Sequence, residues 1–542
     1  MRKTPKFFSS LREMVTMNVN ADPGHIAYMY KVNGEVVSVT NQQFYDCVEN
    51  LGAALVEAGF GRSHIACLSE NRYNWIEVYF TSLLTAGVFV PIDKELPADN
   101  VVYLLNDSAS EIIFCSEKYE ALLRAHESEL PGLKYVICFD RDEDDGKYLS
   151  YKKFMASGEK LDKIEYDSLK SDDNELKYLV YTSGTTGVAK GVMLTEHNIC
   201  CGIYYGMRVS SVFDKGLSVL PYNHTYEAVC EILVAFHSHT TLCINDSLRK
   251  VQENMKFYQP DYIFLVPAFS DHFYAAIWKG IEKKGMTKTF KRMIKLSNGM
   301  RKIGIDLRRK LFKSVLEQFG GKLEKIVCGG APIRPEVGKF FDDIGISMTG
   351  GYGITECSPL VSVNDESDNN FNSAGHKLEC LEWRIDEPDS DGIGEICVKG
   401  DVVMLGYYKR PDLTAEVLKD GWFYTGDYGY INEKDEIVIT GRKKNIIIMS
   451  NGKNIYPEEL EARIANIPYV TEVVVSGITN EHGQDVSLQA EIYIEDENAD
   501  RSNLSADVKK ACAELPPYKH ITKIITRDEP FAKTTTNKIK RG

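Results

Sequence analysis

Long apolar runs are missing from this 542-residue sequence. A helix that crosses a bilayer needs about 20 mostly apolar residues, and nowhere do even about 18 follow one another. The first residues, MRKTPKFFSSLREMV, are basic but hold no apolar stretch of signal-peptide length. We therefore expect a protein that neither spans a membrane nor is exported by that route.

Paired cysteine motifs are also missing, although the chain has 13 cysteines. No CxxC pair occurs, and the adjacent Cys200 and Cys201 lie in an apolar stretch where a zinc site would lack partners. An odd number of cysteines without a framework is typical of reduced thiols. We expect free thiols and a cytoplasmic location.

An excess of positive charge is absent as well. The 64 Lys and Arg residues are outnumbered by 78 Asp and Glu, which gives a formal net charge of −14. A nucleic-acid surface calls for a basic patch, so we expect no nucleic-acid partner. Anionic ligands must then be bound by local groups of cations.

Four apolar residues near the N-terminus, Phe7, Phe8, Leu11 and Val15, could form a weak amphipathic face. Such a face can lie on a membrane surface or dock against the rest of the protein. We favour a docked helix and expect at most a peripheral membrane contact.

The first part of the chain alternates between helix and strand patterns. Thr40 can cap a helix that ends near Gly59, HIACLSE reads as a strand, a helix through Trp75 ends near Gly87, and VFVPI follows as the next strand. Parallel sheets with crossover helices are the economical architecture. The predicted fold class is α/β.

The character of the sequence changes near residue 440, where ITGRKKNIIIMSNGKNIYP precedes a helix that Pro457 opens. Two strand-like runs, VTEVVVSGI and VSLQAEIYI, a helix from Ala506 and a basic tail follow. We predict a large domain over residues 1–443 and a small, mobile α+β domain over residues 444–542.

The most informative segment is YTSGTTGVAKGVMLTEHN, residues 181–198. Gly184 and Gly187 allow backbone N–H groups to turn around an anion, the hydroxyl residues among them donate hydrogen bonds, and Lys190 supplies charge. No GK[ST] ends the loop, so it is not a Walker A motif. The composition predicts a phosphate-binding loop.

This loop is similar to the signature of the adenylate-forming superfamily of acyl-CoA synthetases, adenylation domains and luciferases, and further motifs of that superfamily follow in order. These are PYNHTYE (221–227), VCGGAPI (327–333), GGYGITECSP (350–359), GWFYTGDYGYI (421–431), GRKKNIIIMSNGKNIYPEELE (441–461) and KTTTNKIKR (533–541). Such enzymes bring a carboxylate to the α-phosphorus of ATP, so their site must neutralise two anions and hold an in-line attack.

The resemblance assigns ATP-binding roles residue by residue. It implies that Thr355 binds the α-phosphate, that Glu356 binds the Mg²⁺ that bridges phosphate oxygens, that Tyr352 stacks on adenine and that Asp427, with Arg442 as its partner, accepts both ribose hydroxyls. The residues implied to surround the nucleotide are Thr182, Ser183, Gly184, Thr185, Thr186, Gly187, Lys190, Gly329, Gly330, Ala331, Pro332, Gly351, Tyr352, Gly353, Thr355, Asp427 and Arg442.

Two further segments are implied to handle the carboxylate. PYNHTYE looks like a segment of long-chain fatty acyl-CoA synthetases in which the histidine, here His224, borders the carboxylate and acyl pocket. Lys538 matches the lysine of the last motif, which binds the carboxylate and α-phosphate during adenylation. Asn537 stands where Gly is usual, and because Asn tolerates positive φ we expect the loop conformation to survive.

The GRKKN segment matches the hinge of the family, which places the hinge at Lys444. Rotation of the small domain would exchange Lys538 for a loop that shapes the thiol tunnel, namely Ser450, Asn451, Gly452 and Lys453. An exposed basic pair is the alternative interpretation of Lys443 and Lys444, and the sequence does not separate the two.

The resemblance therefore predicts a medium- or long-chain fatty acyl-CoA synthetase that uses ATP, Mg²⁺ and coenzyme A. One alternative is a ligase that loads a stand-alone acyl carrier protein, and another is a catalytically silent sensor of nucleotide and fatty acid. The aromatic stretch 257–278 could line an acyl tunnel, although such a stripe at helical spacing is more often core.

Overall fold

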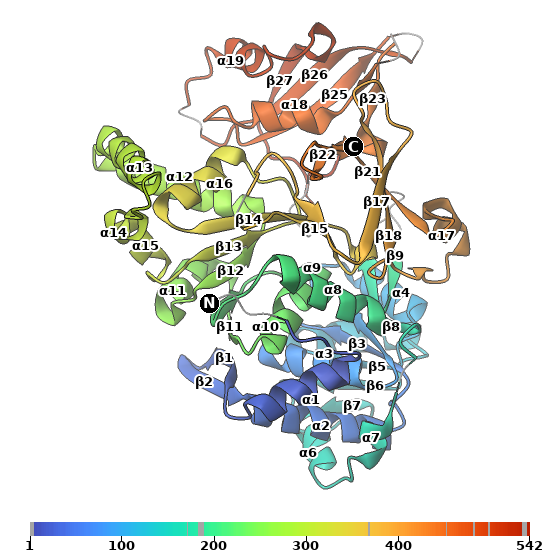
Figure 1. Cartoon of the computed structure of the whole chain (residues 1–542). Helices are drawn as coiled ribbons and strands as arrows, with labels where there is room; N and C mark the ends of the chain where they lie inside the picture. The colour runs from blue at the N-terminus through green and yellow to red at the C-terminus, as the bar shows by residue number, and fades with distance from the viewer. Residues whose placement is uncertain are drawn as a thin grey trace. The chain divides into compact units, whose positions relative to one another are not determined.

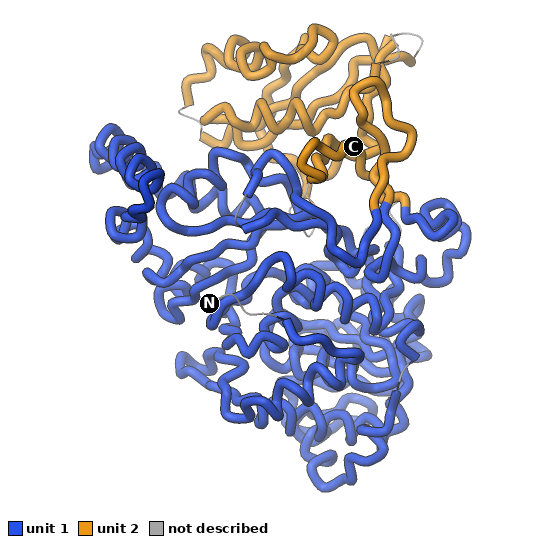
Figure 2. Tube along the Cα trace, viewed as in Figure 1, with its two compact units in different colours: residues 1–382, 398–423 blue, residues 383–397, 424–542 orange. Residues whose placement is uncertain are grey.

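The computed structural model describes residues 5–170, 172–182, 189–366, 369–450, 453–480, 483–496, 499–533 and 539–541. The chain forms two compact units, Met1–Glu382 with Val398–Phe423, and Trp383–Cys397 with Tyr424–Gly542 (Figure 2). The predicted division into domains 1–443 and 444–542 stays a prediction.

One large sheet of the first unit has the strand order β19-β9-β8-β4-β3-β5-β6-β7 among the described residues (Figure 1). Its pairs from β8 through β7 are parallel, whereas β9 is antiparallel to both β8 and β19. Its strands are β3 (His64–Leu68), β4 (Val88–Pro91), β5 (Ile112–Cys115), β6 (Tyr135–Cys138), β7 (Tyr148–Ser150), β8 (Leu176–Thr182), β9 (Lys190–Thr195) and β19 (Gly406–Tyr407).

The other large sheet has the order β16-β15-β14-β13-β12-β10-β11-β1-β2 in the described part of the chain. It is parallel from β14 to β1, with antiparallel strands at both edges. Its strands are β1 (Ile26–Val32), β2 (Glu35–Thr40), β10 (Lys215–Ser218), β11 (Thr241–Ile244), β12 (Tyr262–Leu265), β13 (Lys325–Cys328), β14 (Ser347–Gly353), β15 (Leu360–Val363) and β16 (His376–Lys377).

Helices of the first unit connect many of the parallel strands, which confirms the predicted α/β class. They are α1 (Leu11–Ala21), α2 (Asn41–Glu57), α3 (Tyr73–Leu84), α4 (Ala98–Asp107), α5 (Glu117–Ala125), α6 (Tyr151–Glu159), α7 (Ile164–Ser168), α8 (Glu196–Val209), α9 (Thr225–Glu227), α10 (Val234–His237), α11 (Val251–Tyr258), α12 (Pro267–Lys283), α13 (Thr287–Arg301), α14 (Arg308–Leu311), α15 (Lys313–Leu316), α16 (Pro335–Ile344) and α17 (Pro411–Val417).

A third sheet joins β17 (Leu381–Asp386), β18 (Gly394–Gly400), β21 (Trp422–Ile431), β20 (Leu418–Lys419) and β22 (Ile437–Arg442). The C-terminal part then forms a small α+β module, as predicted, although the sequence did not indicate its third strand, β27. Its elements are β23 (Ile447–Ile448), β24 (Asn454–Ile455), α18 (Pro457–Ile464), β25 (Glu472–Thr479), β26 (Asp485–Tyr493), α19 (Leu504–Ala511) and β27 (Ile521–Arg527).

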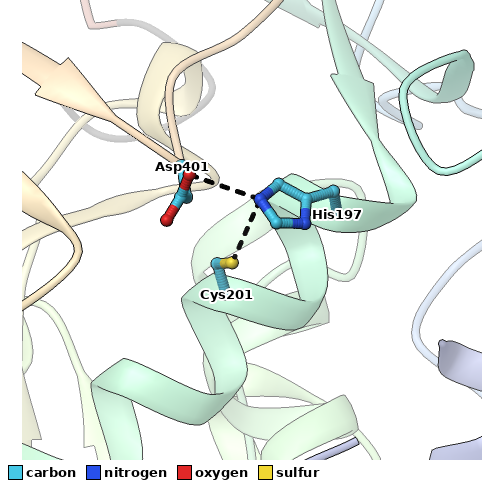
Figure 3. A group of neighbouring side chains, drawn as sticks. All are labelled: His197, Cys201 and Asp401. Carbon is cyan, nitrogen blue, oxygen red and sulfur yellow. Dashed lines mark hydrogen bonds and ion pairs between the residues drawn. The ribbon is translucent and has the colours of Figure 1, made fainter. Parts of the chain in front are cut away.

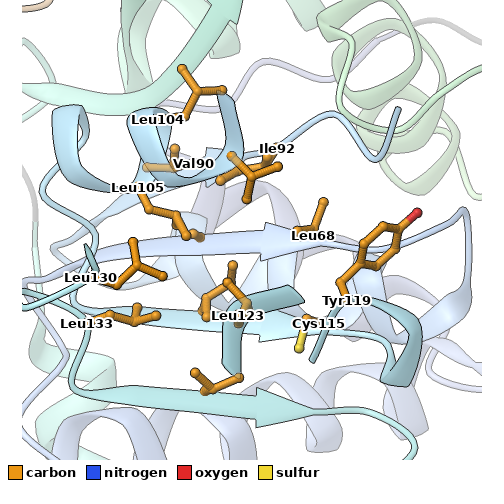
Figure 4. Close-up of a cluster of buried hydrophobic side chains, with 14 of the residues drawn as sticks. Leu68, Val90, Ile92, Leu104, Leu105, Cys115, Tyr119, Leu123, Leu130 and Leu133 are labelled. Atoms are coloured by element: carbon orange, nitrogen blue, oxygen red, sulfur yellow. The ribbon is translucent and has the colours of Figure 1, made fainter. Parts of the chain in front are cut away.

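Local signals explain where the second helix begins and ends. Thr40 and Gln43 form the reciprocal hydrogen bonds of a capping box, and Gly59 follows the helix with φ +84°. Phe44 and Leu55 on its apolar face are fully buried. Apolar residues of strands β3 to β6 and of helices α4 and α5 form a separate core cluster (Figure 4).

The N-terminal helix is docked, as we favoured. Phe8, Leu11 and Val15 are buried, whereas Phe7 is 70% exposed. In the described chain no helix is both long and apolar enough to cross a bilayer. All thirteen cysteines are free.

Candidate functional site

The predicted phosphate loop is flanked by a regular pair of strands. β8 and β9 are antiparallel, with Thr182 opposite Lys190. Residues 183–188, which include Ser183, Gly184, Thr185, Thr186 and Gly187, lie outside the described residues. What the structure adds is a neighbour for Lys190, whose ammonium lies 5.0 Å from the ring centre of Tyr407.

Tyr407 connects Lys190 to the predicted magnesium ligand. Its hydroxyl donates a hydrogen bond of 2.9 Å to Glu356 Oε1, and both side chains are more than nine-tenths buried. The backbone N–H of Met404 donates to the carbonyl of Glu356 as well. The structure thus brings Lys190 and Glu356, distant in sequence, to the same tyrosine.

Sequence analysis missed Tyr407. It lies in GYYKRPDLT, where β19 pairs with β9 and Pro411 opens α17. A Gly-Tyr-Tyr run before a proline-initiated helix carries no chemical signature by itself, so only the strand pairing could have indicated its role.

The two predicted adenine segments follow neighbouring strands. β13 and β14 are parallel, with Cys328 opposite Gly350, so the GGAP turn and the Gly351–Gly353 stretch come at the carboxyl ends of adjacent strands. Gly330 has φ +84°, which favours glycine. A Cβ at Gly329 would lie 3.0 Å from the ring of Tyr226. This edge is where ligands bind in open α/β sheets.

Tyr352 and Thr355 lie at the end of β14 and in the short helix after it. Tyr352 is 7% exposed, and Thr355 begins a 3₁₀ turn that also contains Glu356. The predicted adenine, phosphate and magnesium residues of this motif therefore occupy one short segment of the first unit.

The predicted ribose pair is formed within the second unit. Asp427 on β21 and Arg442 on β22 are directly opposite each other, and Arg442 Nε lies 2.6 Å from Asp427 Oδ1. The Asp427 side chain is 5% exposed and that of Arg442 is 42% exposed. The strand register therefore places a buried carboxylate beside a half-exposed cation.

The predicted hinge lies between two anchored residues. Lys443 Nζ is 2.5 Å from Glu395 Oε2, a bond that raises the pKa of Lys443, and Asn445 Nδ2 donates to Glu458 Oε1. Lys444 is exposed. Glu395 and Glu458, the partners of Lys443 and Asn445, belong to the second unit. In the described chain, Lys444 is the one of these three residues whose side chain has neither an ion pair nor a hydrogen bond.

The loop assigned to coenzyme A is the tip of the β23–β24 hairpin. Ser450 donates its backbone N–H to the carbonyl of Asp485, and the carbonyl of Lys453 accepts from Met449. Asn451 and Gly452 lie outside the described residues.

Lys538 also lies outside the described residues, but both flanks of its segment are anchored. Lys533 Nζ is 2.6 Å from Glu472 Oε1, and Arg541 pairs with Glu461. Burial raises the pKa of Glu461 to about 7, with Arg541 acting in the opposite direction.

His224 precedes a helix that contains two buried acids. Glu227 ends α9, and Glu231 lies in the π-helical turn Ala228–Leu233 that follows. Both are fully buried. Burial raises the pKa of Glu227 to about 7 and that of Glu231 well above its usual value. Ser218 Oγ donates to Glu227. Glu227 is the last residue of the PYNHTYE motif, whereas the sequence analysis missed Glu231, whose one sign in the sequence is that it lies four residues after Glu227 in an apolar run.

The aromatic residues Tyr274 and Trp278 of α12 are half-buried and contact neighbouring aromatic side chains. Trp278 contacts Phe290 and Phe340, with ring centres 5.6 and 5.7 Å apart. Tyr274 also contacts Phe340. The tunnel assignment of this stretch stays a prediction.

These features agree with the family that the sequence resembles. The family of AMP-binding enzymes matches residues 15–408, and the AMP-binding enzyme C-terminal domain matches residues 444–542. The chain therefore belongs to the AMP-binding enzyme family.

Curated relatives extend over most of the chain. A protein of Mycobacterium bovis named long-chain-fatty-acid–CoA ligase FadD15 is 27% identical over 488 residues, which cover 86% of this chain and 79% of that protein. Long-chain-fatty-acid–CoA ligase 1 of Cavia porcellus is 28% identical over 80% of this chain and 67% of that protein.

Solved structures show the same fold. The anthranilate CoA ligase AuaEII, in complex with anthranoyl-AMP, has a TM-score of 0.80 at 17% identity and covers 98% of this chain and 96% of its own. A fatty acyl CoA synthetase of Mycobacterium tuberculosis has a TM-score of 0.68 at 20% identity, with the same coverage of both chains.

Proposed function

We propose that this protein is an AMP-forming ligase that activates a medium- or long-chain fatty acid with ATP and transfers the acyl group to coenzyme A. The contact of Tyr407 with both Lys190 and Glu356 carries the proposal. It supports a common site for a phosphate-binding cation and a metal-binding carboxylate within the AMP-binding unit. The names of the relatives support the choice of fatty acid and coenzyme A.

In the first reaction an oxygen of the fatty carboxylate attacks the α-phosphorus of ATP, the bond to the β-phosphate oxygen breaks, and pyrophosphate leaves. Thr182 and Lys190, with the loop between them, hold the β- and γ-phosphates, and Thr355 holds the α-phosphate. Lys538 neutralises the carboxylate as it approaches. Catalysis consists of positioning and charge neutralisation, without a protein nucleophile.

Glu356 fits the Mg²⁺ that the family implies. A carboxylate oxygen is the ligand that Mg²⁺ prefers, and the Tyr407 hydroxyl orients this carboxylate from the side of Lys190. When bound, the ion neutralises phosphate charge. The orienting hydrogen bond and the burial of Glu356 are the protein's contribution.

The nucleoside is held by Tyr352 and the Gly329–Pro332 turn on adenine and by Asp427 on the ribose hydroxyls. The ion pair with Arg442 supports a charged Asp427, which accepts hydrogen bonds more strongly than a neutral acid would. His224 positions the acyl carboxylate. It is not a general base, because a fatty carboxylate is already ionised near neutral pH.

In the second reaction the thiol sulfur of coenzyme A attacks the acyl carbonyl, and AMP leaves with its bonding electrons. We assign Lys444 as the hinge between domains 1–443 and 444–542, and Ser450–Lys453 as the loop that contacts the pantetheine arm. We assign the local group of cations Arg442, Lys443, Lys444 and Lys453 to the coenzyme A phosphates, although Arg442 and Lys443 also pair with acids. The thirteen free thiols support a cytoplasmic location.

Pyrophosphate exchange with a panel of fatty acids, followed by mass analysis of the products, tests the proposal. We expect exchange that depends on a medium- or long-chain acid and on Mg²⁺, and acyl-CoA as the product. Nucleotide binding without exchange would indicate a sensor. Coenzyme A and a holo acyl carrier protein offered at equal concentration would decide the acceptor, and acylation of the carrier alone would overturn the coenzyme A assignment.

A further inference from the structure

Three side chains with metal-binding atoms converge on one side of helix α8 (Figure 3). His197 and Cys201 lie four residues apart on α8 and so share a face, and Asp401 directly follows β18. Cys201 Sγ lies 3.6 Å from His197 Nε2, and Asp401 Oδ1 lies 3.4 Å from the same nitrogen. Sequence analysis assigned Cys201 no metal-binding partners, and the structure corrects this.

These distances match those between ligands on a tetrahedral metal. Bonds of about 2.0 Å to nitrogen or oxygen and about 2.3 Å to sulfur place neighbouring ligand atoms roughly 3.3 to 3.6 Å apart. The two measured separations fall in this range, and all three ligand atoms lie within 4.8 Å of one another. An ion would draw the third pair, the Cys201 sulfur and an Asp401 oxygen, from within 4.8 Å to roughly 3.5 Å.

The backbone that carries the ligands is fixed by a buried amide. Asn198 Nδ2 donates to the carbonyl of Asp401 at 2.7 Å and to that of Val403 at 3.1 Å. Asn198 is also the third residue of the capping box with Thr195 that begins α8. The same residue thus fixes the start of the helix and the turn at Asp401, so the site does not depend on flexible loops.

Asp401 contributes a negative charge to this group of side chains. In the described chain its ion-pair partner is His197, and no Lys or Arg forms an ion pair with it. A bound cation would neutralise both Asp401 and the thiolate it creates.

We propose that His197, Cys201 and Asp401 bind a divalent transition metal of the Zn²⁺ class, at a site distinct from the Mg²⁺ site of Glu356. A ligand set of imidazole, thiolate and carboxylate suits Zn²⁺ or Co²⁺ and not Mg²⁺ or Ca²⁺. The half-exposed ligands leave the fourth position to water. The ion would join α8 to the segment Asp401–Tyr407, which ends at the tyrosine that holds Glu356.

Titration of the metal-free full-length protein with Co²⁺ tests the proposal, because a thiolate ligand gives a near-ultraviolet charge-transfer band. We expect one such site, displaced by Zn²⁺, with loss of the band in Cys201→Ser. His197→Gln and Asp401→Asn should weaken binding by at least about 10- to 100-fold, the loss seen when even an outer partner of a metal ligand is removed.

Matched controls separate this site from general thiol or histidine binding. Cys47→Ser removes another half-buried thiol, and His126→Gln removes a surface histidine that contacts Glu129 without a thiol. Both should bind Co²⁺ as the wild type does. Equal binding by wild type and the triple variant His197→Gln/Cys201→Ser/Asp401→Asn would overturn the site and leave only a hydrogen-bonded histidine. Thermal unfolding of the metal-free variants checks that each is folded.

Discussion

The β21–β22 hairpin and the π-helical turn after His224 both bury carboxyl groups, but in opposite electrostatic settings. In the hairpin, Asp427 has a guanidinium 2.6 Å away. In the turn, Glu227 and Glu231 have each other, and burial raises the pKa of both. Burying an unpaired charge costs more than protonating it. The hairpin thus keeps Asp427 charged as a hydrogen-bond acceptor, whereas the turn keeps a buried carboxyl group protonated.

The substitution Lys538→Ala tests whether the carboxylate of the substrate, like that of Asp427, needs a nearby cation. We expect adenylation to fall by about 10² to 10³, the usual cost of one preorganised donor, while thioester formation from supplied acyl-AMP persists. Pyrophosphate exchange and acyl-AMP consumption measure the two steps. Lys540→Ala, two residues on and exposed, is the control. Equal loss in both half-reactions would contradict the role.

Lys444→Pro should affect the opposite half-reaction. Proline fixes φ and removes the N–H donor, so a protein held in the adenylating pose should exchange pyrophosphate but form thioester at least about 10²-fold more slowly. Lys444→Ala removes the charge and keeps the backbone free, so it should retain most of the rate. Normal thioester formation by the proline variant would move the hinge, and our domain boundary, elsewhere.

The substitution Asp427→Asn removes the charge of the buried acid in the β21–β22 hairpin. The amide keeps the shape but loses the charge, and hydrogen bonds to a charged group contribute about 1.5 to 3 kcal/mol. We expect KM for ATP to rise by roughly 10- to 100-fold, with little change in folding. Glu433→Gln, exposed in the turn of the same hairpin, should have no effect. An unchanged KM in Asp427→Asn would exclude Asp427 as the ribose acceptor.

Whether a feature could be predicted from the sequence depends on whether its cause is local or distant along the chain. The cap at Thr40 and the pairing of Asp427 with Arg442 depend on a short-range pattern and on one hairpin, so motifs sufficed to predict them. Tyr407 did not have such a signal. Its contacts with Lys190 and Glu356 exist only because β19 joins the edge of a sheet whose other strands come from far earlier in the chain.

The π-helical turn is a second feature that could not be predicted from the sequence. An apolar run predicts a buried helix, but it does not predict that Glu227 and Glu231 will face each other inside it. A π turn inserts a residue into the helix and changes which side chains align, and such turns have no sequence rule comparable to a cap. The pair therefore had to be found in the structure.

The substitution Glu231→Gln tests the pair of acids in the π-helical turn. Its effect on the free energy of unfolding should be smallest at low pH. Folded pKa values above the unfolded ones mean that the contribution of the pair to stability is fully present below about pH 4.5. Glu227 loses its part as the pH rises through about 7, and Glu231, whose pKa is raised well above its usual value, loses its part at higher pH. A neutral amide at position 231 has no proton to lose, so the variant should lose less stability than the wild type as the pH rises, because Glu227 is then the one acid of the pair that must ionise.

Urea unfolding from pH 5 to 9 measures the slope of this decline. Glu77 and Glu461, whose pKa values burial also raises to about 7, contribute equally to wild type and variant, so the difference between the two curves isolates the proton of Glu231. Glu253→Gln, exposed on α11, should reproduce the wild-type slope. Parallel curves for wild type and Glu231→Gln would mean that Glu227 and Glu231 are charged in the fold, and that a buried pair of acids here needs no shared proton.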